Sequence, residues 1–288
     1  MKKYSFLLIL AVIIIAYFTN EAEAGAFDSI SLNARPIGMG EAFTSVMGGL
    51  DSVRYNPAGL AKVYESQLLM SYRDFYNLRL VNQKYAGFAV PGRYINFGLS
   101  WHRIGTTSRV SFMEYKEDIY SLAMAGKIKK IRNLFGGADF KFYRVFSQSN
   151  ASGYGIDLGM YYEMFYKKLS IGFKKSLNKK RVYWDTGVTD KLENDFRLGM
   201  CVVPLKNCKL ALDTVNGLEK LNFGLEIGII GEIFKLRTGI KNANKAYKIL
   251  CMGMGLSFGD INIDYALTKH RYLDLTHFFS LYIKISRH

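Results

Sequence analysis

The sequence has few of the residues on which metal sites and disulfide frameworks depend. Its 288 residues include three cysteines and four histidines. The cysteines, Cys201, Cys208 and Cys251, show no metal-ligand spacing, and an odd number in an exported chain argues against a disulfide framework. We expect them to be small packing residues. The sequence shows no phosphate-binding loop and no dinucleotide fingerprint, so we predict no cofactor and no metal ion.

Residues arranged for nucleophilic catalysis are also scarce. Ser100 and His102 come closest to a serine–histidine pair. Side chains two positions apart on a strand are separated by about 7 Å, and no acidic partner is evident for the histidine. We therefore predict that the protein is not an enzyme.

Long apolar runs are confined to the amino terminus. The uncharged stretch from Phe6 to Phe18 follows two lysines and precedes the tripeptide Ala22-Glu23-Ala24. This order is typical of a secretory signal peptide with its cleavage site. About 13 apolar residues fall short of the roughly 20 that a spanning helix needs, so we predict a cleaved signal peptide over residues 1–24.

Later parts of the chain contain no uncharged stretch long enough for a spanning helix. Insertion into a membrane would therefore require a β-barrel, because only helices and closed barrels satisfy every backbone hydrogen bond in lipid. A soluble exported protein is the alternative.

The chain has fewer acidic than basic residues. The chain has 24 acidic against 39 basic residues and a net charge of +15. Basic residues cluster at 127–132 (KIKKIR) and 174–181 (KKSLNKKR). Because an exported protein seldom meets nucleic acid, we predict no nucleic-acid partner. We expect the basic clusters to be solvated turns without a partner, and anionic lipid headgroups or acidic surface glycans are the alternative partners.

The sequence is rich in glycine and aromatic residues, with 27 glycines, 20 tyrosines and 20 phenylalanines but only four prolines. From Glu65 onward it divides into segments of about ten residues in which apolar residues alternate with polar or small ones. Between 221 and 229, for example, Leu, Phe, Leu, Ile and Ile alternate with Asn, Gly, Glu and Gly. Alternation of this kind predicts strands with one apolar face.

This pattern predicts fourteen strands, an even number, as a single-chain bacterial barrel requires. They are expected near residues 65–73, 82–90, 94–103, 117–126, 133–145, 153–162, 166–174, 194–203, 207–214, 220–230, 233–241, 247–258, 260–268 and 274–286.

The predicted connections differ in length on the two sides. Short turns such as 91–94 and 204–207 alternate with long connections at 104–116 and 175–193, and the basic turn 127–132 is a longer exception among the short ones. Short periplasmic turns and longer outer loops are typical of outer-membrane barrels. We predict a closed antiparallel transmembrane β-barrel of about 14 strands over residues 65–288, in the outer membrane of a Gram-negative-type bacterium. A soluble sandwich, whose strands also alternate, is the alternative.

Residues Asn33 to Val63 read NARPIGMGEAFTSVMGGLDSVRYNPAGLAKV. This stretch resembles the amino-terminal signature of FadL-like outer-membrane channels and of the PorV/PorQ family. Residues 223–242 and 263–285 are similar to the terminal hairpins of the PorV/PorQ branch.

The resemblance implies a barrel whose amino-terminal segment, residues 25–64, folds into the lumen as a hatch containing a short helix or turn. It also implies a structural or gating role for the hatch motif, and we expect Arg35 to pair with a carboxylate in the lumen such as Glu226 or Asp264. The hatch motif consists of Arg35, Gly38, Gly40, Asn56, Pro57 and Gly59.

Two functions follow from the resemblance. A PorV/PorQ-type protein takes part in surface export or assembly together with secretion-system components, or passes hydrophobic small molecules. In the export role, the loop from Lys174 to Lys191, with Tyr183 and Trp184 at its centre, would be the docking surface. The alternative is a FadL-like channel for long-chain fatty acids or other hydrophobic compounds. Outer-membrane lipid is an expected partner in both cases.

Overall fold

The computed structural model describes residues 32–110, 114–177, 181–192, 196–217, 220–230, 232–244, 247–269 and 273–285. The predicted signal peptide, residues 1–24, lies outside the described residues, and so do the first residues of the predicted hatch, 25–31. No helix within the described ranges combines the length and apolarity needed to cross a membrane.

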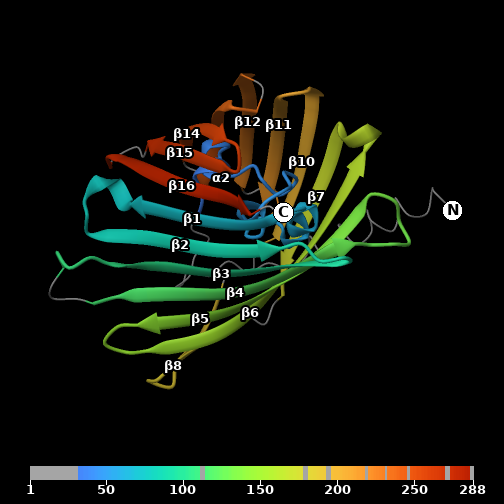
Figure 1. Cartoon of the computed structure of the whole chain (residues 1–288). Helices are drawn as coiled ribbons and strands as arrows, with labels where there is room; N and C mark the ends of the chain where they lie inside the picture. Colours follow the sequence, from blue (N-terminus) through green and yellow to red (C-terminus); the bar gives the residue numbers. More distant parts are fainter. Residues whose placement is uncertain are drawn as a thin grey trace.

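Fourteen strands in the described part of the chain form one closed antiparallel barrel (Figure 1). They are β1 (Ser66–Asp74), β2 (Val81–Val90), β3 (Ile95–Thr106), β4 (Lys116–Lys127), β5 (Leu134–Phe146), β6 (Ala151–Met164), β7 (Leu169–Ser176), β10 (Phe196–Leu205), β11 (Cys208–Val215), β12 (Lys220–Ile230), β13 (Phe234–Asn244), β14 (Tyr247–Phe258), β15 (Ile261–Lys269) and β16 (Leu275–Ile285).

Each barrel strand pairs with its neighbours in chain order, β7 pairs with β10, and β1 closes the barrel by pairing with β16. The predicted fourteen-stranded barrel is confirmed, and the sandwich is excluded because the sheet has no free edge at β1 or β16. The predicted boundaries agree with the observed ones to within three residues. β7 begins at Leu169 rather than near 166, because the 3₁₀ turn η4 (Phe165–Lys167) occupies the start of the predicted strand.

The connection between β7 and β10 is more ordered than a plain loop. It contains β8 (Arg181–Trp184) and β9 (Thr189–Lys191), which pair with each other. β8 also pairs with the first residues of β6, beyond the point where β7 leaves that strand. The hairpin therefore extends the barrel wall at the end that carries the longer connections, which we call the outer end.

Apolar side chains cover the outside of the barrel. Because side chains alternate between the two faces of a strand, the register places outward residues of neighbouring strands side by side. Near the outer end, one such row consists of Trp101, Tyr120, Phe142 and Tyr154. Aromatic residues at the other end are Tyr94, Tyr166 and Phe258, all exposed. An apolar band between two aromatic girdles is the exterior of a barrel that sits in lipid.

Residues 32–64, the inner segment, lead into β1, and all of them up to Val63 lie inside the barrel (Figure 1). The segment contains the short helix α2 (Ala34–Gly38) and two 3₁₀ turns, η1 (Leu50–Ser52) and η2 (Pro57–Lys62). Helix α2 packs against β13 to β16, whereas η2 packs against β3 to β6 on another part of the wall. The inner segment therefore crosses the lumen.

Candidate functional site

The candidate site is the contact between the inner segment and the inner face of the barrel. Helix α2 starts after Asn33, whose backbone is extended, and Pro36 in its first turn needs no hydrogen-bond partner for a backbone N–H. The Ala34 amide donates to Ser280 Oγ on β16 at 2.9 Å. The start of the helix is thereby fixed to the wall.

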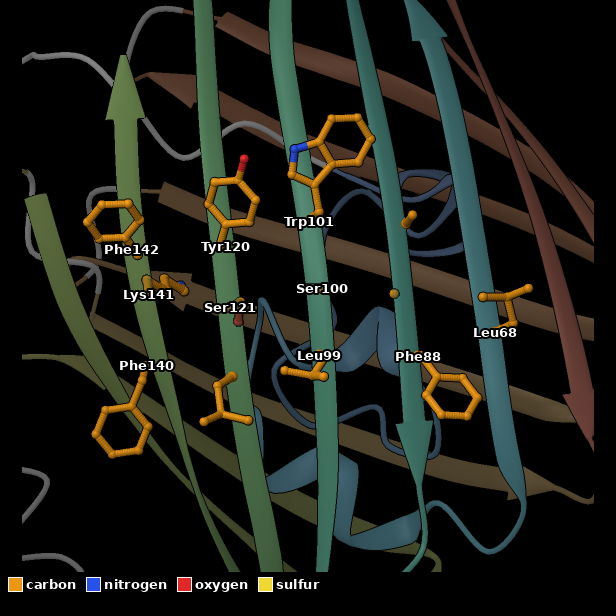
Figure 2. Close-up of a pocket in the computed structure, with 13 residues that line it drawn as sticks. Leu68, Phe88, Leu99, Ser100, Trp101, Tyr120, Ser121, Phe140, Lys141 and Phe142 are labelled. Carbon is orange, nitrogen blue, oxygen red and sulfur yellow. The ribbon is translucent and has the colours of Figure 1, made fainter. Parts of the chain in front are cut away.

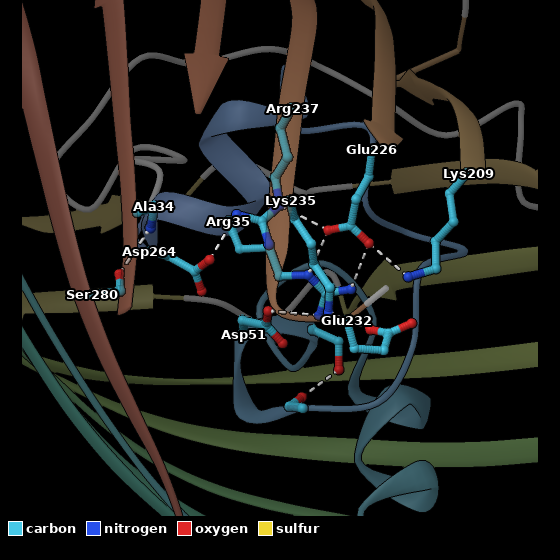
Figure 3. Close-up of polar contacts among 12 residues, drawn as sticks. Ala34, Arg35, Asp51, Lys209, Glu226, Glu232, Lys235, Arg237, Asp264 and Ser280 are labelled. Carbon is cyan, nitrogen blue, oxygen red and sulfur yellow. Dashed lines mark hydrogen bonds and ion pairs between the residues drawn. The ribbon is translucent and has the colours of Figure 1, made fainter. Parts of the chain in front are cut away.

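Arg35 is held at this point by carboxylates from two different elements (Figure 3). Its Nε lies 3.1 Å from Glu226 Oε2 on β12, and its Nη1 lies 3.2 Å from Asp51 Oδ2 on η1. The expected pairing of Arg35 with a lumen carboxylate is therefore present, with Glu226 as the partner. An ion pair between the inner segment and β12 results.

Glu226 is the centre of a larger ionic cluster. It also accepts from Arg237 Nε at 2.7 Å and from Lys209 Nζ at 2.6 Å, and its side chain is only 3% exposed. Arg237 in turn donates to Asp264 on β15 at 2.6 Å. Three cations thus converge on the Glu226 carboxylate. Their positive charges compensate its negative charge, which would be very costly to bury alone.

Burial and charge act in opposite directions on the ionisable groups of the inner segment. Burial alone would lower the pKa of the Arg35 guanidinium, but Glu226 and Asp51 outweigh it and raise that pKa above its ordinary value. Burial raises the pKa of the Asp51 carboxyl, and the neighbouring Arg35 only partly offsets this. Arg35 is therefore a fixed cation at the centre of the contact.

Glycines on the inner face of the wall make room for the backbone of the inner segment. A Cβ at Gly137 on β5 would lie 2.6 Å from the backbone of Pro57 and Ala58, and one at Gly224 on β12 would lie 2.5 Å from Met39 O. The wall glycines whose added Cβ would meet the backbone of the inner segment are Gly137, Gly172, Gly199, Gly224, Gly239 and Gly253, and those that would meet its side chains are Gly98 and Gly159. Their distribution over eight strands shows that the wall is shaped around this segment.

Two glycines of the predicted motif meet this wall directly. Gly38 ends helix α2 opposite Gly253, where an added Cβ would lie 3.1 Å from the Gly253 Cα. Gly40 has φ of 59° and would place a Cβ 2.7 Å from the Ile240 amide nitrogen. A side chain at Gly40 is thus disfavoured by both conformation and space.

The NPAGL sequence forms the turn that joins the inner segment to β5 and β6. The Asn56 side chain accepts from the Ala58 amide and donates to Thr44 O at 2.9 Å and Met160 O at 2.8 Å. Pro57 then begins η2, and Gly59 packs against Ser52. Asn56 therefore links two parts of the inner segment to the wall.

Asp213 on β11 holds the middle of the inner segment. Its Oδ2 accepts from the backbone amides of Phe43 and Thr44, each at 2.8 Å, and the residue is fully buried. Sequence reasoning missed Asp213 and Arg237. An acidic or basic residue at an inward position of an alternating strand is the signal that identifies both.

Replacing Asp213 with alanine is expected to loosen the inner segment without unfolding the barrel. Two buried amides would lose a charged acceptor, which costs about 2 kcal/mol. We expect tryptic cleavage after Arg54 or Lys62 to become roughly thirtyfold faster, because cleavage follows the population of the open form. The control is Asp185→Ala, which removes an exposed carboxylate that accepts from the Asn150 amide in a loop. Equal cleavage rates for both variants would contradict a holding role for Asp213.

A small cavity lies between the inner segment and the outer end of the barrel. Its volume is about 120 Å³, and Ile37, Phe75, Phe278 and Arg73 are among its lining residues. Arg73 lies between two rings, with its Cζ 3.7 Å from the Phe75 centroid and 4.9 Å from the Phe278 centroid. It is only 6% exposed, and its Nε and Nη2 have no hydrogen-bond partner among the described residues. The cavity thus combines apolar walls with the buried cation of Arg73 and with the ion pair between Lys241 and Glu41.

Of the remaining residues singled out in the sequence, Cys251 lines the cavity and Cys201 packs with Met39 and Phe43 of the inner segment. His102 is buried on the inner face, where its Nε2 lies 2.7 Å from Gln83 Nε2. Cys201 and Cys251 are buried and Cys208 is partly buried, all as free thiols. No group of three or more potential metal ligands was found among the described residues.

Comparison with known proteins supports the barrel fold. No family model and no curated protein sequence matches the chain. Among solved structures, the toluene transporter TodX of Pseudomonas putida covers 90% of this chain and 98% of its own, with 11% identity and a TM-score of 0.66. The CymD monoaromatic hydrocarbon channel covers 91% and 100%, with 11% identity and a TM-score of 0.67.

A Pseudomonas aeruginosa FadL homologue is also similar, covering 88% of this chain and 98% of its own, with 13% identity and a TM-score of 0.61. At these identities the likeness establishes the fold. The structural neighbours support the FadL-like resemblance, whereas the PorV/PorQ assignment stays a prediction.

Proposed function

We propose that the protein is a non-enzymatic outer-membrane channel that passes hydrophobic or amphiphilic small molecules, with the inner segment as its hatch. The observation that carries this proposal is the cavity at Arg73, which lies directly on the outer side of the inner segment. The similar structures TodX and CymD are a toluene transporter and a monoaromatic hydrocarbon channel. The apolar band on the barrel exterior supports a location in the outer membrane.

The cavity has the composition expected of a first binding site on such a route. Apolar pockets with a few placed polar groups are the usual form of small-molecule sites. A cavity of about 120 Å³ is of the same order as apolar protein cavities that take up a benzene ring. The free N–H groups of Arg73 would hold one acceptor oxygen or a carboxylate, while the rings of Phe75 and Phe278 contact the apolar part.

Passage beyond the cavity requires the hatch to move. The hatch is held by charged and amide contacts at a few points, chiefly Arg35 to Glu226, Asp213 to Phe43, and Asn56 to Met160. Buried apolar residues such as Phe43, Leu50 and Leu60 also hold the hatch, so its departure from the wall would expose apolar surface as well as break these polar contacts. The hatch motif residues Arg35, Gly38, Gly40, Asn56, Pro57 and Gly59 would then set how readily the hatch leaves the wall.

Uptake in a strain that lacks the gene tests the function. We expect the wild-type gene to restore uptake of a radiolabelled long-chain fatty acid and of an aromatic hydrocarbon, and to leave uptake of a sugar unchanged. Arg73→Met should weaken carboxylate uptake about tenfold or more, since a charged hydrogen bond contributes about 1.5–3 kcal/mol, while hydrocarbon uptake persists. Equal uptake of both hydrophobic probes with and without the gene would contradict the proposal.

Among the described residues, no specific contact favours the export role. Its predicted docking surface, the loop with Tyr183 and Trp184, forms the β8–β9 hairpin that pairs with β6.

A further inference from the structure

The outer face of the β2–β5 wall carries a row of basic residues that the channel function does not use. Lys84 on β2 lies opposite Arg103 on β3, Arg103 lies opposite Asp118 on β4, and Asp118 lies opposite Arg144 on β5. All four occupy outward positions, and the row carries three positive charges and one negative charge. An excess of positive charge therefore faces outward at a single level of the barrel.

The row lies at the outer border of the apolar band. Arg103 follows the start of β3 at Ile95 by eight positions, and at about 3.3 Å per residue with a tilt of about 40° this is a height of roughly 20 Å. The aromatic row with Trp101, Tyr120 and Phe142 lies immediately below it. Cationic side chains on the solvent side of an aromatic girdle lie at the depth of the lipid headgroups.

Asp118 fixes the geometry of this row. Its Oδ1 accepts from Arg103 Nε at 2.7 Å and from Trp101 Nε1 at 2.9 Å, and its Oδ2 accepts from Arg103 Nη2 at 2.7 Å. Asp118 is completely buried beneath these two side chains, whereas the Arg103 side chain stays 33% exposed. The acid therefore orders Arg103, while the exposed Lys84 and Arg144 keep the surface positive.

An apolar groove crosses the wall below the basic row, between two neighbouring levels of outward side chains (Figure 2). It measures about 620 Å³, and outward side chains such as Leu68, Phe88, Leu99 and Phe140 line it. The small residue Ala86 leaves its middle open. Figure 2 shows Trp101, Tyr120 and Phe142 at one level of the wall and Phe140, Leu99 and Phe88 at the next, toward the other end of the barrel.

We propose that this wall is a specific binding site for a phosphorylated glycolipid of the outer leaflet, with an acyl chain in the groove and phosphates at the basic row. Lys84 and Arg144 lie three strands apart, about 14 Å between their Cα atoms. A disaccharide headgroup with a phosphate at each end reaches both cations at once, whereas the single phosphate of a glycerophospholipid reaches one. The chemistry of the site thus selects a bisphosphorylated, multiply acylated disaccharide.

This proposal rests on the outer-membrane location given under the proposed function, and native mass spectrometry of the purified full barrel tests it. The probes are bisphosphorylated lipid A, monophosphoryl lipid A and phosphatidylglycerol. We expect affinity in that order, and we expect Lys84→Gln with Arg144→Gln to weaken binding of the bisphosphorylated form about 25-fold. That value corresponds to about fivefold for each basic residue near a lipid surface. Ala86→Trp should weaken all acylated probes by filling the groove.

The matched control is Lys248→Gln with Lys269→Gln, two exposed outward lysines on β14 and β15, for which we expect a change of less than about twofold. Heat-modifiable gel mobility verifies that each variant is folded. Equal binding by wild type and the Lys84/Arg144 variant, or equal binding of phosphatidylglycerol and bisphosphorylated lipid A, would overturn the proposal. If the protein binds bisphosphorylated lipid A but does not support uptake of hydrophobic probes, the channel function is rejected and the lipid site is retained. If it supports uptake but does not bind this lipid selectively, the lipid site is rejected and the channel function is retained.

Discussion

Replacing Glu226 with glutamine is expected to destabilise the protein by about 3–5 kcal/mol, because removing one partner of a buried ion pair leaves the opposite charge buried and uncompensated. The neutral amide would leave Arg35, Arg237 and Lys209 converging on a side chain that no longer carries negative charge. Asp51 and Asp264 compensate only part of this charge. Urea unfolding in detergent, followed by heat-modifiable gel mobility, measures the loss.

The chain offers a matched control for this substitution. Glu232→Gln makes the same chemical change at a carboxylate that pairs with Lys235 but is 75% exposed. Exposed ion pairs contribute little, so we expect a change within about 0.5 kcal/mol. The interpretation fails if the two variants unfold at the same urea concentration. Faster tryptic cleavage after Arg54 in Glu226→Gln alone would show that the inner segment is the part released.

Replacing Gly137 with valine is expected to displace the NPAGL turn and open the lumen. A Cβ there would lie 2.6 Å from backbone atoms of Pro57 and Ala58, which cannot rotate away as a side chain can. Overpacking of this kind costs about 1–3 kcal/mol, whereas the strand itself tolerates a β-branched residue. We therefore expect a folded barrel with higher ion conductance in planar bilayers.

The neighbouring Gly136 provides the control for Gly137. It faces the other side of β5, and a Cβ there would meet the flexible Ile128 side chain at 3.3 Å. Gly136→Val is expected to keep the wild-type conductance. Unchanged conductance in Gly137→Val would show that the inner segment does not block the lumen at this point.

Most of the fold was predictable because it depends on local patterns. Alternation along segments such as 220–230 predicts a strand, and its apolar face predicts which side chains point outward. The start of β7 was misplaced because Phe165 to Lys167 form a turn with positive φ at each residue, and no glycine or asparagine announces it. The β8–β9 hairpin was missed because its strands are short and pair with β6 over only a few residues.

The candidate site was predictable only in part. Arg35 was expected to find a lumen carboxylate, and the resemblance singled out Asn56 and Pro57. The roles of Asp213 and Arg73 could not be inferred, because their surroundings are set by residues far away in the chain. The Phe43 amide, for example, meets Asp213 across 170 positions.

The sequence by itself determined the number of barrel strands and the face that each of their side chains occupies, since a strand repeats every two residues whatever it packs against. The tertiary structure decided which side chains of the inner segment and of the wall meet. Joining β1 to β16 brought Arg35 and Glu226 together across 191 positions and set the wall glycines against the inner segment. The pairing of β2 to β5 aligned Lys84, Arg103 and Arg144 at one height, because turn geometry and the apolar pattern together set the register of neighbouring strands.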